Sequence, residues 1–160
     1  MITNRGFTLI EILIVIVIIG ITAGFALISF GDFGESRRVL FSADQLVNTL
    51  KLAQQKAILE TSTLGLRIDN TSYQILRFRN ISGWEPISNK GVFKVNYFPK
   101  NTFITLKTNN KPHPGAPPII INSSGDMTPF TLGFGTNKDI IITLRGTHNG
   151  NLSFSTANPK

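Results

Sequence analysis

The uncharged stretch between Ile12 and Gly31 constrains this chain more than any other feature. About 20 residues there carry no charge, and isoleucine and valine dominate the first half. A helix of that length, at ~1.5 Å per residue, matches the ~30 Å core of a bilayer. The stretch has no polar face, and the other residues are too few to enclose it as a buried core helix. No A-x-A cleavage site of a removable signal peptide follows it. We therefore expect a transmembrane helix over residues 7–30.

Glu11 is the exception, because it places a carboxylate at the start of this apolar helix. One interpretation is that the side chain reaches the membrane interface, where a charge is tolerated. The other is that Glu11 pairs with a cation. A cut between Gly6 and Phe7 would create an α-ammonium on Phe7, one helical turn away. That ammonium could pair with Glu11 of a neighbouring subunit in a bundle of low dielectric and set the stagger between subunits.

The residues from Arg5 to Glu11 read RGFTLIE, and they resemble the class III signal of type IV pilins and type II secretion pseudopilins. This resemblance implies that a prepilin peptidase cuts after Gly6 and methylates the new N-terminal Phe7. Residues 1–6 would then be a leader peptide on the cytoplasmic side. The rest would be a single-pass protein of the bacterial inner membrane, with its C-terminal domain in the periplasm.

Two glycines in the apolar helix, Gly20 and Gly24, form a small-xxx-small pattern. Such a pattern lets membrane helices approach closely, so both residues are candidates for subunit assembly. The alternative is that the spacing arose by chance.

Residues 31–60 are predicted to continue as an amphipathic periplasmic helix. Gly31 and Gly34 loosen its start and suggest a flexible neck. Apolar residues then recur at alternating spacings of four and three, at Val39, Ala43, Leu46, Leu50, Ala53 and Ala57. A coiled coil is possible, but the short length and the polar residues between favour docking on a sheet.

From residue 61 to residue 160 the chain reads as a β-rich periplasmic domain. Short β-rich runs alternate with turn signals such as Asp69-Asn70-Thr71-Ser72. The expected strands are LGLRI, YQILRFR, VFKVNYF, TFITLK, PIIINS, PFTLGF, DIIITLR and NLSFS. The run KPHPGAPP, residues 111–118, is expected to be a stiff exposed loop. The predicted fold class is α+β, with a long N-terminal helix packed on an antiparallel β-sheet or two-sheet sandwich.

The composition predicts no catalytic residue, metal ligand or cofactor. There is no cysteine, which excludes thiol chemistry and Cys-ligated metals. The two histidines, His113 and His148, lie in turn-like or proline-rich segments, and the few acidic residues after residue 60 are scattered. The net charge of +7 arises wholly in residues 61–160. This charge indicates either a solvated surface or an anion-binding face.

Two further segments resemble the H-type minor pseudopilins of type II secretion, the GspH/FimT group. They are residues 119–132, with the pattern strand–SSG–x–x–TPF–x–L, and residues 41–57 of the helix. The resemblance implies a structural subunit near the pseudopilus tip that joins tip to shaft and supports export of folded proteins across the outer membrane. Its partners would be the major and other minor pseudopilins and, less directly, secreted substrates. The alternative is a FimT-like minor pilin that binds DNA for uptake. DNA binding is the weaker expectation. FimT proteins that bind DNA carry an arginine-rich C-terminal motif, whereas the last eleven residues here carry a single basic residue, Lys160.

Overall fold

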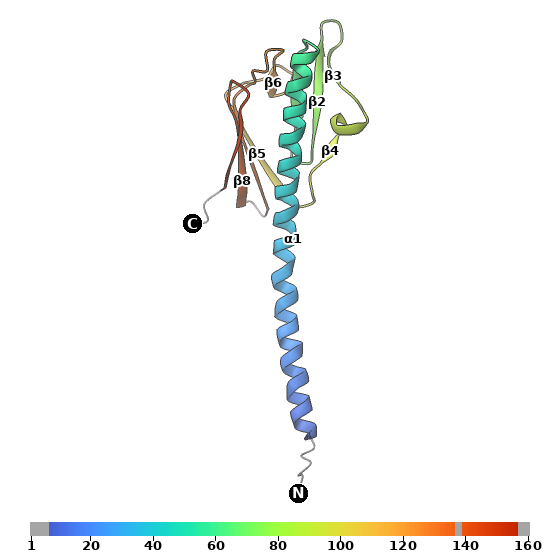
Figure 1. The fold of residues 1–160 in the computed structure, drawn as a ribbon, viewed down its shortest axis with the longest axis vertical. Helices are drawn as coiled ribbons and strands as arrows, with labels where there is room; N and C mark the ends of the chain where they lie inside the picture. Colours follow the sequence, from blue (N-terminus) through green and yellow to red (C-terminus); the bar gives the residue numbers. More distant parts are fainter. Residues whose placement is uncertain (1–6, 137–138, 157–160) are drawn as a thin grey trace. The chain divides into compact units, whose positions relative to one another are not determined.

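The computed structural model describes residues 7–136 and 139–156, without the side chains of residues 26–33. The chain divides into two compact units, Met1–Glu35 and Ser36–Lys160. Helix α1, Leu9–Leu59, begins in the first unit and supplies the helical layer of the second (Figure 1). The predicted helix is confirmed, and its backbone stays helical through residues 31–36. The flexible neck stays a prediction.

A backbone reversal at Thr61 ends α1. The Ser62 N–H donates to the carbonyl of Ala57 (3.0 Å), and the Thr61 N–H donates to that of Ile58 (3.3 Å). This pair of bonds is the Schellman arrangement, which satisfies carbonyls that the helix leaves without partners. It requires a left-handed residue, and Thr61 has φ 47°. The chain therefore turns directly from α1 into its first strand.

In the part of the chain that the structure describes, nine strands form two antiparallel sheets beside α1 (Figure 1). Sheet A has the order β3-β2-β1-β6, with β4 also paired to β2, and sheet B has the order β5-β7-β8-β9. The strands of sheet A are β1 (Leu64–Ile68), β2 (Ser72–Arg79), β3 (Gly83–Pro86), β4 (Asn96–Tyr97) and β6 (Ile119–Ile121). Those of sheet B are β5 (Thr102–Thr108), β7 (Phe130–Thr136), β8 (Asp139–Gly146) and β9 (Leu152–Thr156). The predicted α+β class with antiparallel strands is confirmed, and of the two arrangements expected, one sheet or two, the structure has two.

The expected strand over residues 92–98 is wrong for most of its length. Gly91–Phe93 forms a 3₁₀ turn, η1, and only Asn96–Tyr97 pairs as β4. The Asn96 side-chain amide donates to the carbonyls of Val92 (3.3 Å) and Lys94 (3.0 Å). These local bonds compete with a strand ladder. Sheet A instead gains β3, Gly83–Pro86, a short strand ending in proline that the sequence patterns did not indicate.

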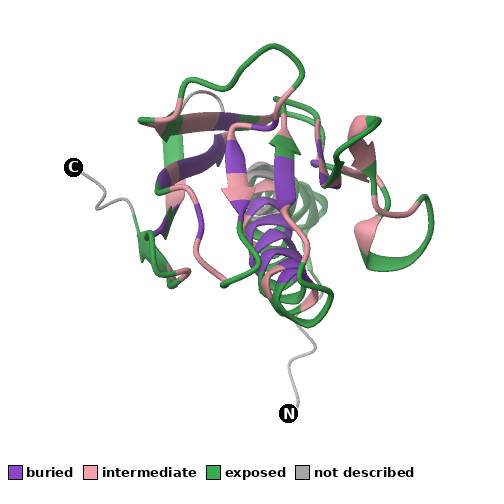
Figure 2. Cartoon of the chain, turned by 90° about the horizontal axis from the view of Figure 1, so that it is seen from above, coloured by how far each residue is buried: buried purple, intermediate pink, exposed green. Residues whose placement is uncertain are grey.

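The core of the second unit lies where one face of α1 meets the inner faces of both sheets. All six residues predicted to form the apolar face of α1 are buried, namely Val39, Ala43, Leu46, Leu50, Ala53 and Ala57. Figure 2 shows these buried turns facing buried strand segments. Sheet A contributes Leu64, Leu66, Tyr73, Ile75, Ile119 and Ile121, and sheet B contributes Ile104, Phe130, Leu132, Phe134 and Leu144. The amphipathic half of α1 is therefore a core element of this unit.

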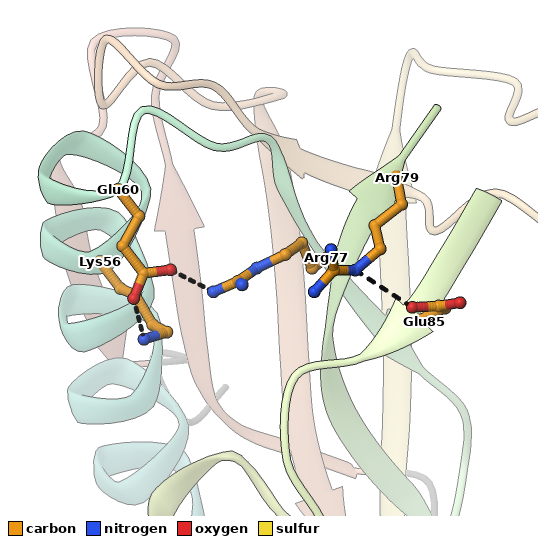
Figure 3. Close-up of polar contacts among 5 residues, drawn as sticks. All are labelled: Lys56, Glu60, Arg77, Arg79 and Glu85. Atoms are coloured by element: carbon orange, nitrogen blue, oxygen red, sulfur yellow. Dashed lines mark hydrogen bonds and ion pairs between the residues drawn. The ribbon is translucent and has the colours of Figure 1, made fainter. Parts of the chain in front are cut away.

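A carboxylate directly after α1 connects the end of the helix to sheet A. Glu60 accepts hydrogen bonds from Lys56, one turn earlier, and from Arg77 on β2 (Figure 3). The hydrogen bond from Lys56 lowers the pKa of Glu60, and the charges of Arg77 and Lys56 act in the same direction. On the neighbouring β3, Glu85 pairs with Arg79 of β2 at 3.3 Å (Figure 3). These partly exposed ion pairs add little to stability, but they fix the direction of the side chains.

The proline-rich segment before β6 covers the outer face of sheet A. Residues 111–115 are exposed as predicted, but Pro117 is buried. A Cβ placed on Gly65 of β1 would lie 2.3 Å from the Cγ of Pro117 and 2.9 Å from the ring of Trp84. Only glycine leaves room there for both side chains. The end of the loop is thus part of the packing of sheet A.

Candidate assembly site

The expected cleavage motif is described only in part. Gly6 lies outside the described residues, so the structure adds nothing on it. Phe7 precedes α1 and is 79% exposed. The peptidase cut and the methylation of Phe7 stay predictions.

Glu11 forms a reciprocal pair of hydrogen bonds with Thr8 at the start of α1. The backbone N–H of Glu11 donates to Thr8 Oγ1 (3.3 Å), and the backbone N–H of Thr8 donates to Glu11 Oε2 (3.4 Å). Since α1 begins at Leu9, Thr8 is the N-cap and Glu11 the third helical residue. This is a capping box, which satisfies two N–H groups that the helix cannot pair itself. The sequence carried the signal as T-x-x-E, but our sequence interpretation did not use it.

Gly20 and Gly24 leave open space on the surface of the first unit. A Cβ added at either position would meet no heavy atom within 4 Å outside the local helix backbone. The large apolar side chains from Leu9 to Phe25 are exposed. The hydroxyl of Thr22 donates to the carbonyls of Ile18 (2.9 Å) and Ile19 (3.0 Å). This surface therefore presents apolar side chains and two open positions at the glycines. The Thr22 hydroxyl adds no unpaired donor to it, because it is bonded within the helix.

One structural criterion bears on the predicted membrane span. Within the part of the chain that the structure describes, no helix satisfies both the length and the hydropathy expected of a membrane-spanning segment.

The described residues of the second unit form no cluster of metal-binding side chains. His113 and His148 are both exposed. Glu85 pairs with Arg79, and the carboxylate of Asp126 accepts a hydrogen bond from the Ser124 hydroxyl. Among the described residues there is no group of three or more histidine, cysteine, aspartate or glutamate side chains that could hold a metal ion.

Two family models match the chain in separate regions. The prokaryotic N-terminal methylation motif matches residues 1–27. The family described as type II transport protein GspH matches residues 42–154. The first match covers the expected cleavage motif, and the second covers most of the second unit.

Curated relatives agree with these matches. The type II secretion system protein H of Pseudomonas aeruginosa is 29% identical over 144 residues, which cover 81% of each chain. The protein of the same name from Vibrio cholerae is 28% identical over 162 residues, covering 82% of each chain.

Solved structures share the fold. The minor pseudopilin EpsH from the type 2 secretion system of Vibrio cholerae has a TM-score of 0.66 and 21% identity, over 77% of this chain and 99% of that one. The solution structure of Escherichia coli GspH has a TM-score of 0.64 and 21% identity, over 76% and 90%. The family model for GspH spans more than half of the residues, and the chain therefore belongs to the family of type II transport protein GspH.

Proposed function

We propose that this chain is a minor pseudopilin, a structural subunit of a type II secretion pseudopilus that supports export of folded proteins across the outer membrane. The observation that carries the proposal is the match of residues 42–154 to the GspH family, next to a methylation motif over residues 1–27. The absence of cysteine and the scattered acidic residues fit a subunit without chemistry of its own. Its binding partners are other pseudopilins, major and minor.

The proposal includes the processing and membrane insertion of the N-terminal segment. A prepilin peptidase cuts between Gly6 and Phe7 and methylates Phe7, and the uncharged helix holds the subunit in the inner membrane with its second unit in the periplasm. The subunit then lies near the pseudopilus tip and joins tip to shaft. Gly20 and Gly24 support assembly with neighbouring subunits, because their open surfaces would let a neighbouring helix approach closely.

Glu11 has two roles in this proposal, one within its own subunit and one between subunits. Within the subunit it caps α1 through Thr8. Between subunits its charge pairs with the Phe7 ammonium made by cleavage, in a bundle where breaking a buried pair costs ~3–5 kcal/mol. The two roles can be separated because a glutamine at the same position can still accept the hydrogen bond of a capping box but carries no charge.

A variant series in a secreting strain tests the proposal. Gly6→Leu should leave the protein uncut, seen as the larger mass of the precursor. Glu11→Gln should be cut normally but impair secretion, whereas Thr8→Ala, which loses the cap at ~1 kcal/mol, should secrete almost normally. Asp44→Asn, on an exposed helical position of the second unit, is the charge-matched control.

Different outcomes would remove different parts of the proposal. Normal cleavage of Gly6→Leu would refute the processing step. Normal secretion by Glu11→Gln would refute the intersubunit pair and leave the cap as the role of Glu11. If deletion of the whole gene left secretion unaffected, the proposed function would be wrong.

A DNA-binding minor pilin is the second candidate. The observation that favours it is the excess of positive charge in residues 61–160. Duplex binding driven by such charge falls linearly in log affinity with log salt concentration, with a slope of about −0.9 per phosphate. We expect only weak binding that vanishes at physiological salt, and a tight complex there would favour this candidate.

A further inference from the structure

A basic depression of about 660 Å³ opens at one end of sheet B, and the proposed function does not use it. Three strand ends meet there: the end of β5, the start of β7 and the end of β8. The basic side chains around it are those of Lys107, Arg145 and His148. The apolar lining comes from Leu106, Pro129 and Phe130. None of the described residues that line this depression is acidic.

The strand register places two cations on the same side of sheet B. Lys107 of β5 lies opposite Thr131 of β7, and Thr131 lies opposite Arg145 of β8. Residues directly opposite one another in antiparallel strands project to one face. Because neighbouring strands are ~4.8 Å apart, the backbones of the two cationic residues are ~10 Å apart. The pair therefore flanks a threonine in the middle of an open surface.

The positive charge of this pair has no counter-charge in the described part of the protein. Lys107 and Arg145 are both exposed, and neither forms an ion pair with a described residue. Asp126, three residues before Pro129 in the chain, accepts a hydrogen bond from the Ser124 hydroxyl through its carboxylate. The depression is thus a place where an external anion would be attracted without displacing an internal one.

We propose that this depression binds an extended acidic segment of another polypeptide. Arginine offers a planar fork that matches a carboxylate, and lysine adds a second point of positive charge. In an extended chain, residues advance by ~3.3 Å, so carboxylates two to four positions apart span the distance between the cations. A nucleic acid backbone would need a longer row of cations than the two that meet here.

The test measures binding of a short fluorescent peptide that alternates glutamate with alanine, using the full chain in non-ionic detergent at low salt. The double variant Lys107→Gln with Arg145→Gln should weaken binding by about tenfold, because two partly exposed ion pairs are lost. The control is Arg67→Gln with Lys90→Gln, which removes the same charge from other exposed sites and should change binding little. The peptide with glutamine in place of glutamate should not bind.

Three outcomes would overturn the inference. Equal weakening in both double variants would mean that only net charge matters. Unchanged binding in the Lys107 and Arg145 variant would place the ligand elsewhere. Tighter binding of a short DNA duplex, lost in the same variant, would make this a phosphate site instead.

A variant that exchanges the two cations but keeps their charge tests whether the loss of binding results from misfolding. Lys107→Arg with Arg145→Lys should keep peptide binding, and the emission of Trp84, the only tryptophan, should be unchanged in every variant. These measurements use purified chain and do not depend on fibre assembly. A failure here would therefore leave the proposed role in secretion untouched.

Discussion

At the level of single residues, the Asp69 carboxylate organises the turn between β1 and β2. Its Oδ1 accepts hydrogen bonds from the backbone N–H groups of Thr71 and Ser72 (both 2.7 Å) and from the Thr71 hydroxyl (2.8 Å). Its Oδ2 accepts one from the Ser72 hydroxyl (3.1 Å). These donors, the Thr71 N–H first, favour the charged form and lower the pKa of Asp69.

Asp69→Ala should lower the free energy of unfolding by about 1 kcal/mol at neutral pH, because exposed turn hydrogen bonds are lost. The folded pKa lies below the usual value of 3.8, so the unfolded state takes up the proton first as the pH falls. The stabilisation by Asp69 is therefore complete above that value and is lost as the pH falls through the folded pKa. Urea unfolding at pH 7 and at progressively lower pH measures this.

The control for that experiment is Asn70→Ala, in the same turn and exposed. Its effect should be small and independent of pH. A penalty for Asp69→Ala that stayed constant down to pH values well below the usual pKa would contradict the assigned cause.

At the level of secondary structure, Gln54 attaches α1 to two turns that lie far away in sequence. Its side-chain amide donates to the carbonyl of Gly150 (2.8 Å), between β8 and β9, and to that of Gly125 (3.2 Å), between β6 and β7. Gly150 has φ 82°, and a Cβ there would lie 2.3 Å from Gln54 Nε2. One polar residue on α1 thus holds both turns close to the helix.

Gln54→Ala should lower the free energy of unfolding by ~1–2 kcal/mol, because two partly buried carbonyls lose their donor. Gln55→Ala, at the exposed neighbouring position, is the matched control and should have little effect. Hydrogen exchange should accelerate at the backbone amides of both turns. Exchange that accelerated at only one turn would show that the other carbonyl does not depend on Gln54.

At the level of the second unit as a whole, small residues on α1 let both sheets share one core with it. Ala43, Ala53 and Ala57 are fully buried, and Leu46 and Leu50 fill the space between them. Leucines at every position would hold the sheets further from the helix axis. Close packing of this kind leaves no room for added methylene groups.

Ala53→Leu should therefore destabilise the second unit by ~1–3 kcal/mol through overpacking. Leu52→Ala, at an adjacent position that is 41% exposed, should change stability by less than ~1 kcal/mol, although it changes the side chain by the same three carbon atoms. Urea unfolding followed by Trp84 emission compares the two. A larger effect at residue 52 would mean that the buried face of α1 is wrongly assigned.

Amino-acid order alone was sufficient for features that local physics sets. The length of α1, its buried face, the hairpin of β1 and β2 and the α+β class follow from periodicity, from helix propensity and from a turn that Asp69 closes with its own neighbours. The choice between one sheet and two was left open by the sequence. The T-x-x-E of the capping box was equally local, and Thr8 could have been identified by the same reasoning.

Strand partners and surface sites required the packed structure, because they join residues that only chain folding brings together. Strand β6 pairs with β1 although more than fifty residues separate them in sequence. Residues 91–95 do not form a strand, because the Asn96 side chain bonds to the Val92 and Lys94 carbonyls, which no strand pattern indicates. Lys107 and Arg145 become neighbours only through the register on either side of Thr131. Periodicity predicts which face of a strand is apolar, but the choice of partner depends on loop closure and on packing of the whole core.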